Sequence, residues 1–79
     1  MSARSMVGRI IHARRRELGM TQVELAARLC RTQQWVSLVE KGKRDVQNLD
    51  DLRWVAAQLD IQPERFGLLP VAAITAGVA

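Results

Sequence analysis

The 79-residue chain is predicted to fold as one all-α domain, a compact bundle of five helices. Three observations predict this class. Apolar residues recur at helical spacing along most of the chain, residues that cap helices precede several of these segments, and aromatic side chains number only three. We expect residues 1–69 to form the domain. Residues 70–79 carry no charge and no periodicity, so we expect them to be poorly ordered or to lead into a longer chain.

The first helix is predicted to end before Gly19, because glycine suits the position that closes a helix. Val7, Ile11 and Leu18 fall on one face of this helix. Arg14 falls on the same face, where its aliphatic stem can cover the core while its guanidinium reaches water. The first helix therefore supplies an apolar stripe to the bundle.

Residues 22–41 are the stretch around which the chain is organised, and they are predicted to form two short helices joined by a tight turn. Leu25, Ala26 and Leu29 share one face of the first of these helices. Thr21 and Glu24 stand at the spacing of a capping box, in which a hydroxyl and a carboxylate each bind one free amide at the helix start.

The second helix of this stretch is predicted over residues 33–41, with Thr32 as its cap. Val36 and Val39 face inward, which leaves an outward face of Gln33, Gln34, Ser37 and Leu38. Two glutamines in the first turn are a poor choice for stability alone. A glutamine amide, however, matches the donor and acceptor of an adenine edge in the major groove, and a leucine can touch a thymine methyl. The outward face is therefore predicted to read DNA bases.

Two more helices are predicted downstream. Asn48 can cap the fourth helix, and Trp54 lies off the centre of its stripe, as either peripheral packing or a dimer contact. Pro63 suits the first turn of a short fifth helix, in which Phe66 would either close the core or contribute to a dimer seam. The apolar stripe of the fourth helix consists of Leu49, Leu52, Val55, Ala56 and Leu59.

The charge balance favours a polyanionic partner. The formal net charge is +4, and of the twelve basic residues all except Lys41 and Lys43 are arginine. A single cysteine excludes an internal disulfide framework, and we expect a cytoplasmic protein. The N-terminus lacks the pattern of a signal peptide and no apolar run is long enough to cross a bilayer, so no membrane partner is expected.

No arrangement of residues supports catalysis, so we do not expect an enzyme. The only histidine, His12, has no acidic or cysteine neighbour at ligand spacing and is interpreted as a surface residue without a role. We expect no metal and no cofactor. Cys30 has two interpretations, a redox sensor or a buried packing residue of the turn, and packing is more typical of a lone thiol.

The segments LGMTQVELA, TQQWVSLVEKGKR and NLDDLRWVAAQLDI resemble the Cro/CI-type helix-turn-helix regulators, often called the XRE family, which include the lambdoid phage repressors. The resemblance covers residues 7–69 and implies a lambda-repressor-like fold. It also implies a repressor-like transcriptional regulator that binds a specific double-stranded DNA site, with helix 33–41 in the major groove and two copies in a homodimer. Cys30 departs from the pattern, because the family usually has glycine there and a side chain in such a turn costs about 1 kcal/mol.

The same resemblance implies roles outside the reading face. Arg15 would form a structural ion pair with Glu40, which clamps the first helix to the third. The alternative for Arg15 is a solvated surface arginine. Gln22 would bind a phosphate with its amide at the start of its helix. With the residues that flank the reading helix, the predicted phosphate contacts are Gln22, Thr32, Trp35, Lys41, Lys43 and Arg44.

Several of these interpretations leave an alternative open. A basic run such as residues 41–44 is usually a solvated loop, although its place after the reading helix favours phosphate contact. Trp35 either packs against the neighbouring helix or contacts the sugar–phosphate wall with its indole. For the whole protein, the alternatives are an antitoxin-type protein-interaction module, whose protein partner is unknown, and the DNA-binding head of a longer regulator.

Overall fold

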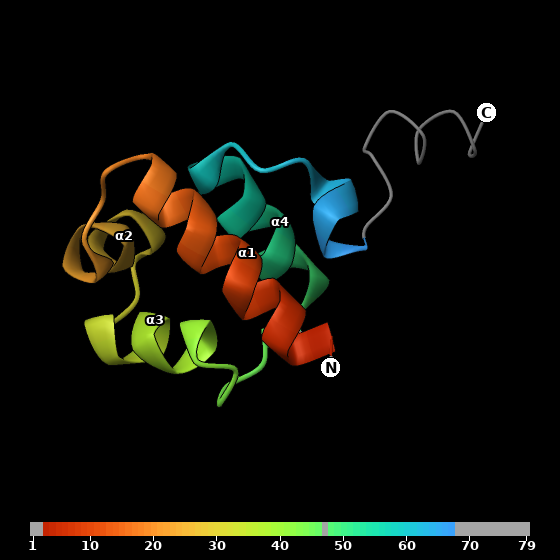
Figure 1. The fold of residues 1–79 in the computed structure, drawn as a ribbon, viewed down its shortest axis with the longest axis horizontal. Coiled ribbons are helices and arrows are strands. Elements are labelled where there is room, and N and C mark those ends of the chain that lie inside the picture. The colour runs from red at the N-terminus through yellow and green to blue at the C-terminus, as the bar shows by residue number, and fades with distance from the viewer. Residues whose placement is uncertain (1–2, 47, 68–79) are drawn as a thin grey trace.

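The structure is a computed structural model that describes residues 3–46 and 48–67, with side chains from Met6 onward. Four α-helices follow one another, α1 (Ala3–Glu17), α2 (Gln22–Leu29), α3 (Gln33–Glu40) and α4 (Leu49–Leu59), and then one 3₁₀ turn, η1 (Pro63–Phe66). Within these ranges the chain forms no strand. In Figure 1, α1 runs diagonally through the middle of the domain, α3 lies along its lower edge and α4 lies behind α1.

The predicted helix caps are confirmed. The Thr21 hydroxyl accepts a hydrogen bond from the Glu24 amide at 3.1 Å, and the Glu24 carboxylate accepts one from the Thr21 amide at 3.0 Å. The Asn48 side chain accepts hydrogen bonds from two amides in the first turn of α4, at 2.8 and 3.3 Å. Each cap satisfies amides that have no partner within the helix and contributes about 1 kcal/mol to its stability.

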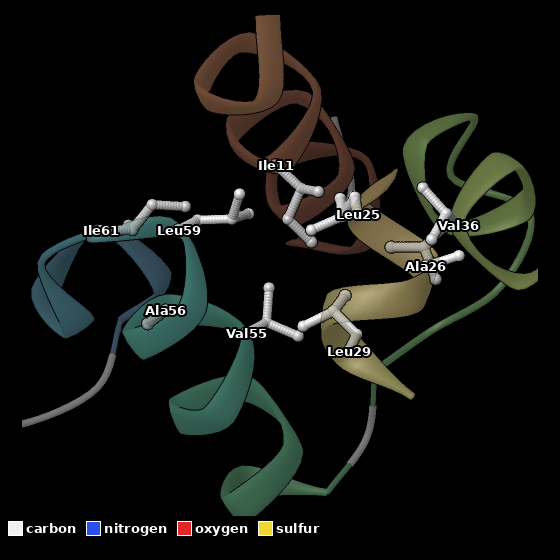
Figure 2. Packing of buried hydrophobic residues seen from close by; sticks show 10 residues of the cluster. Ile11, Leu25, Ala26, Leu29, Val36, Val55, Ala56, Leu59 and Ile61 are labelled. Carbon is white, nitrogen blue, oxygen red and sulfur yellow. The ribbon is translucent and has the colours of Figure 1, made fainter. Parts of the chain in front are cut away.

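The core is built from apolar side chains of all four helices and of the segment that follows α4. Figure 2 shows them converging from the facing helices. Burial of each large aliphatic side chain contributes roughly 1.5–3 kcal/mol, and the predicted stripes of α2 and α3 belong to this core in full. The buried cluster consists of Ile11, Leu25, Ala26, Leu29, Val36, Val39, Val55, Ala56, Leu59 and Ile61.

A close approach between α1 and α3 depends on Gly8, which is buried in the middle of α1. A β-carbon at this position would collide with the carbonyl oxygens of Val39 and Glu40. Because both obstructing atoms belong to the backbone of α3, only glycine permits this contact. The contact holds the C-terminal end of α3, including Glu40, directly against α1.

Some expectations about the outer parts of the bundle are wrong. The segment that begins at Pro63 is a four-residue 3₁₀ turn, so the described residues contain four α-helices and not five. So short a segment favours the tighter 3₁₀ hydrogen bonds over α-helical ones. Leu18 and Leu49 are 41% and 60% exposed, because they lie at the ends of their helices, beyond the reach of the core. Phe66, in contrast, packs against the core, which is one of its two expected roles.

The outer surface of α4 is partly polar and partly apolar. The Arg14 Nε donates to the Leu59 carbonyl at 2.8 Å, so the guanidinium binds the C-terminal end of α4. Trp54 is 48% exposed.

None of the described helices is long and apolar enough to span a membrane. The expectation of disorder for residues 70–79 concerns a segment outside the described residues.

Candidate nucleic-acid interface

The turn between α2 and α3 is closed by Cys30, which ends α2 in the left-handed conformation with φ 58° and ψ 40°. The Arg31 amide donates to the Ala26 carbonyl at 2.9 Å and completes this cap. A side chain in this conformation costs about 1 kcal/mol relative to glycine. The Cys30 side chain is exposed, so its interpretation as a buried packing residue is wrong. In the left-handed conformation that ends α2, the Cys30 side chain lies exposed to solvent.

The exposed side of α3 carries the predicted base-reading residues. The Thr32 hydroxyl accepts a hydrogen bond from the Trp35 amide at 3.0 Å and starts the helix. Val36 and Val39 are buried, so α3 presents one side to the core and the other to solvent. Of the four predicted residues, Gln33 and Gln34 are exposed. Ser37 and Leu38 are half-buried.

The basic turn after α3 folds back onto the end of the helix. The amides of Lys43 and Arg44 both donate to the Leu38 carbonyl, at 2.9 and 3.2 Å. The side chains of Lys41, Lys43 and Arg44 are exposed. Three positive charges therefore lie beside the C-terminal end of α3, where the helix dipole favours cations.

An open cavity of about 470 Å³ lies beside α3, between the helix-turn-helix and the start of α4. The Arg31 guanidinium lies 5.1 Å from the centre of the Trp35 ring, and its Nη2 lies 3.1 Å from the Asp51 carboxylate. Trp35 is half-buried and packs against the core. Its contact with a sugar–phosphate wall stays a prediction. The cavity is lined by Arg31, Trp35, Lys43, Arg44, Asp45, Val46, Asn48 and Asp51.

Arg15 and Glu40 join α1 to the end of α3. The Arg15 Nε donates to Glu40 Oε2 at 2.7 Å and its Nη2 donates to Oε1 at 3.1 Å. The two side chains are 11% and 3% exposed. The Arg15 Nη1 also donates to the Met20 carbonyl at 2.7 Å. The ion pair implied by the family resemblance is therefore present as a bidentate contact, the strongest geometry for arginine and a carboxylate.

Glu40 accepts two further hydrogen bonds, from His12 Nδ1 at 2.8 Å and from Gln22 Nε2 at 3.2 Å. Since a carboxylate only accepts, the hydrogen of His12 must be on Nδ1. The interpretation of His12 as a residue without a role is wrong, because folding brings it to Glu40, 28 positions away in the sequence. Burial by itself would raise the pKa of Glu40, but hydrogen bonds from Arg15, His12 and Gln22 hold this pKa below its usual value of 4.5.

Gln22 connects this buried carboxylate to the predicted reading face. The Gln33 Nε2 donates to Gln22 Oε1 at 2.8 Å. Gln22, a predicted phosphate contact, and Gln33, a predicted base contact, are therefore side by side. The structure also gathers Trp35, Lys43 and Arg44 around the cavity at the other flank of α3.

A family model described as a helix-turn-helix domain matches residues 7–66 of the chain. The chain belongs to this family. Among solved structures, it is similar to the high-resolution crystal structure of the restriction-modification controller protein C.AhdI from Aeromonas hydrophila. The sequences are 29% identical, and the TM-score is 0.69 over 78% of this chain and 88% of the controller. A comparison with curated proteins found no match.

This helix-turn-helix protein is a DNA-binding transcriptional regulator. Its α2 and α3 form the motif, and α1 and α4 form the support on which the motif packs. Among the side chains that the structure describes, no group of His, Cys, Asp and Glu is arranged to hold a metal ion.

The contacts of three residues in this helix-turn-helix domain, Gly8, His12 and Arg31, were not predicted from the sequence. The close approach at Gly8 could have been predicted, because a glycine within an otherwise regular helix often marks close packing. The place of His12 beside Arg15 could also have been predicted, since it lies three residues before Arg15 and so shares its helix face. Arg31 stands four residues before Trp35 but lies in a turn, and its contact with Asp51 joins residues 20 positions apart.

Proposed function

We propose that the protein recognises a specific double-stranded DNA site with α3 in the major groove and acts as a repressor-like homodimer. The observation that carries this proposal is the exposure of two amide side chains, Gln33 and Gln34, in the first turn of α3. In helix-turn-helix proteins the N-terminal residues of the second helix contact base edges. A glutamine amide can bind adenine through N6 and N7 together, while Ser37 and Leu38 extend the face along the groove.

Phosphate contacts are assigned to residues around α3. The N-terminal ends of α2 and α3 carry Gln22 and Thr32, and helix N-termini favour anions. The Thr32 oxygen accepts from the Trp35 amide, which leaves its O–H free to donate to a phosphate. The exposed cations after α3 supply long-range attraction and counterion release. The proposed set is Gln22, Thr32, Trp35, Lys41, Lys43 and Arg44.

The similarity to a restriction-modification controller protein is the observation that favours a transcriptional regulator over an antitoxin-type interaction module. A random-duplex selection at a stated salt concentration tests DNA recognition directly. We expect an enriched palindromic site, since a two-fold dimer requires two half-sites in opposite orientation. Recovery of no enriched sequence would contradict sequence-specific binding.

The homodimer has its own test. Two copies would place their α3 helices about 34–36 Å apart, in successive major grooves of one DNA face. Sedimentation of the complex with the selected duplex should therefore give two chains per duplex. One chain per duplex at saturation would contradict the dimer without affecting base reading by α3.

The roles of base reading and phosphate binding are separated by two single substitutions. Gln34→Ala should lose a contact of about 1–3 kcal/mol on the selected site and relax the preference at one base pair per half-site. Lys43→Ala should weaken binding to all sequences and reduce the slope of log K against log salt by about one per subunit. Both variants are measured on the selected and on a scrambled duplex over a salt series.

The scrambled duplex is the internal control for both variants. Gln34 lies in the first turn of α3 and Lys43 in the turn that follows the helix, so their effects should differ in kind. If Gln34→Ala lowers both affinities by the same factor, Gln34 does not read bases and the assignment of the reading face is wrong.

A further inference from the structure

Glu40 influences the DNA-facing side of the molecule through Gln22. The Glu40 carboxylate is 3% exposed and can only accept hydrogen bonds. Gln22 has both a donor and an acceptor on its amide, and the carbonyl oxygen would be repelled by the carboxylate. Gln22 must therefore turn Nε2 toward Glu40 Oε1, at the 3.2 Å separation observed. The Glu40 carboxylate, which can only accept, therefore determines that the amide nitrogen of Gln22 faces it and that the amide oxygen faces away.

Gln22 transmits its orientation to Gln33. With its Nε2 directed at Glu40, Gln22 presents Oε1 to Gln33, whose Nε2 donates to it at 2.8 Å. Gln33 then keeps one N–H and its carbonyl oxygen for another partner. A donor beside an acceptor is the pattern that fits an adenine edge, whereas the guanine edge presents two acceptors, N7 and O6.

We propose that Glu40 is a specificity-determining residue, which fixes the Gln33 amide through Gln22 in the orientation that selects adenine over guanine. This role of Glu40 rests on the proposed function, because it requires Gln33 to contact bases. The bidentate pair with Arg15 holds the carboxylate in place between α1 and α3. Gln33 is exposed, and without this chain of contacts its amide would be free to rotate.

Gln22→Lys reverses the hydrogen-bonding pattern and is the main test. An ammonium group only donates, so it can bind Glu40 but offers Gln33 no acceptor. Gln33 should then turn its carbonyl oxygen to the lysine and its two N–H groups to the base. The wild type should favour adenine over guanine at the base pair read by Gln33 by a factor on the order of ten. Gln22→Lys should favour guanine.

The measurement is the ratio of Kd values for two duplexes that differ only at that base pair, with A·T or G·C. The base pair is identified as the one whose preference is lost in Gln33→Ala. Because the added charge of the lysine strengthens binding to both duplexes alike, it cancels in the ratio. Gln22→Met, of similar length but without donor or acceptor, should bring the ratio close to that of Gln33→Ala.

Glu40 itself is tested in the double variant Arg15→Met with Glu40→Met. Replacing both partners of a buried ion pair by apolar side chains leaves no uncompensated charge, so the variant should fold, and a thermal melt is used to check this. Gln22 then has no fixed acceptor beside it, so the adenine preference should fall to the level of Gln22→Met. A wild-type preference in this variant overturns the role of Glu40.

Two further outcomes separate this role from the proposed function. If Gln22→Lys keeps the adenine preference of the wild type while Gln33→Ala loses it, Gln33 reads the base but its amide is not oriented by Glu40, and the inference is overturned alone. If Gln33→Ala leaves the preference unchanged at every base pair, both the inference and the assignment of Gln33 as a base-reading residue are overturned.

Discussion

Two arginine–carboxylate pairs connect the helix-turn-helix to the rest of the domain, one near each end of α3. Arg15 and Glu40 make a bidentate contact, and their side chains are 11% and 3% exposed. Arg31 and Asp51 make a single contact at 3.1 Å, and their side chains are 40% and 42% exposed. The two pairs join the same chemical groups, so they differ in burial and in the number of hydrogen bonds between the partners.

Burial changes what each pair can do. In the Arg15–Glu40 pair, the loss of either partner leaves a charge that water cannot reach, so the pair resists disruption. In the Arg31–Asp51 pair both groups remain hydrated, and salt screens their attraction. The buried pair is therefore suited to fixing the position of α3. The exposed pair, in contrast, stays accessible to water and salt.

The largest expected effect is that of Glu40→Ala on stability. The substitution leaves the Arg15 guanidinium buried without its carboxylate, and such losses cost roughly 3–5 kcal/mol. Asp51→Ala is the matched control, because it removes a carboxylate from the exposed pair and should cost about 1 kcal/mol or less. Both values come from chemical denaturation followed by circular dichroism. Equal losses in the two variants would show that burial does not distinguish the pairs.

The next largest expected effect is that of acid on the buried pair. The pKa of Glu40 is lower in the folded protein than its usual value of 4.5, so its contribution to stability is complete above that value. The contribution is lost as the pH falls from about 4.5 through the folded pKa, since the unfolded chain binds the proton first. The melting temperature should therefore fall more steeply below pH 4.5 in the wild type than in Glu40→Gln.

The exposed carboxylate of Glu24 is the control for this acid effect. Its pKa is also lowered, first by its hydrogen bond to the Thr21 amide and then by that to the Thr21 hydroxyl. Glu24→Gln should keep most of the steep acid dependence, because the Glu40 network is intact in that variant. A wild-type profile in Glu40→Gln would show that Glu40 does not govern the acid transition.

The helices could be predicted from the sequence wherever a local rule decides them. Thr21, Thr32 and Asn48 mark helix starts, since a cap needs only a side chain and amides two or three residues away. Periodicity likewise identified the buried faces of α2 and α3. Periodicity failed at Leu49, because it describes a helix of indefinite length and does not show where neighbouring helices stop covering it.

The Glu40 network shows why the rest could not be predicted from the residues alone. Its contacts with His12 and Gln22 join residues 28 and 18 positions apart, and no local pattern encodes such a distance. The pairing with Arg15 was anticipated only through the family resemblance. The side chains that orient one another around Gln33 become visible only once α1, α2 and α3 are packed together.

The smallest expected effect is the coupling within the exposed pair. A double-mutant cycle of Arg31→Ala and Asp51→Ala should give a coupling free energy of about 0.2–1 kcal/mol, and high salt should reduce it further. Arg31→Ala alone should cost more than Asp51→Ala, because it also removes the guanidinium from the Trp35 ring at 5.1 Å. A coupling above about 2 kcal/mol that persists in high salt would contradict this prediction. It would show that the Arg31–Asp51 pair behaves like a buried pair, since only desolvated charges resist screening in that way.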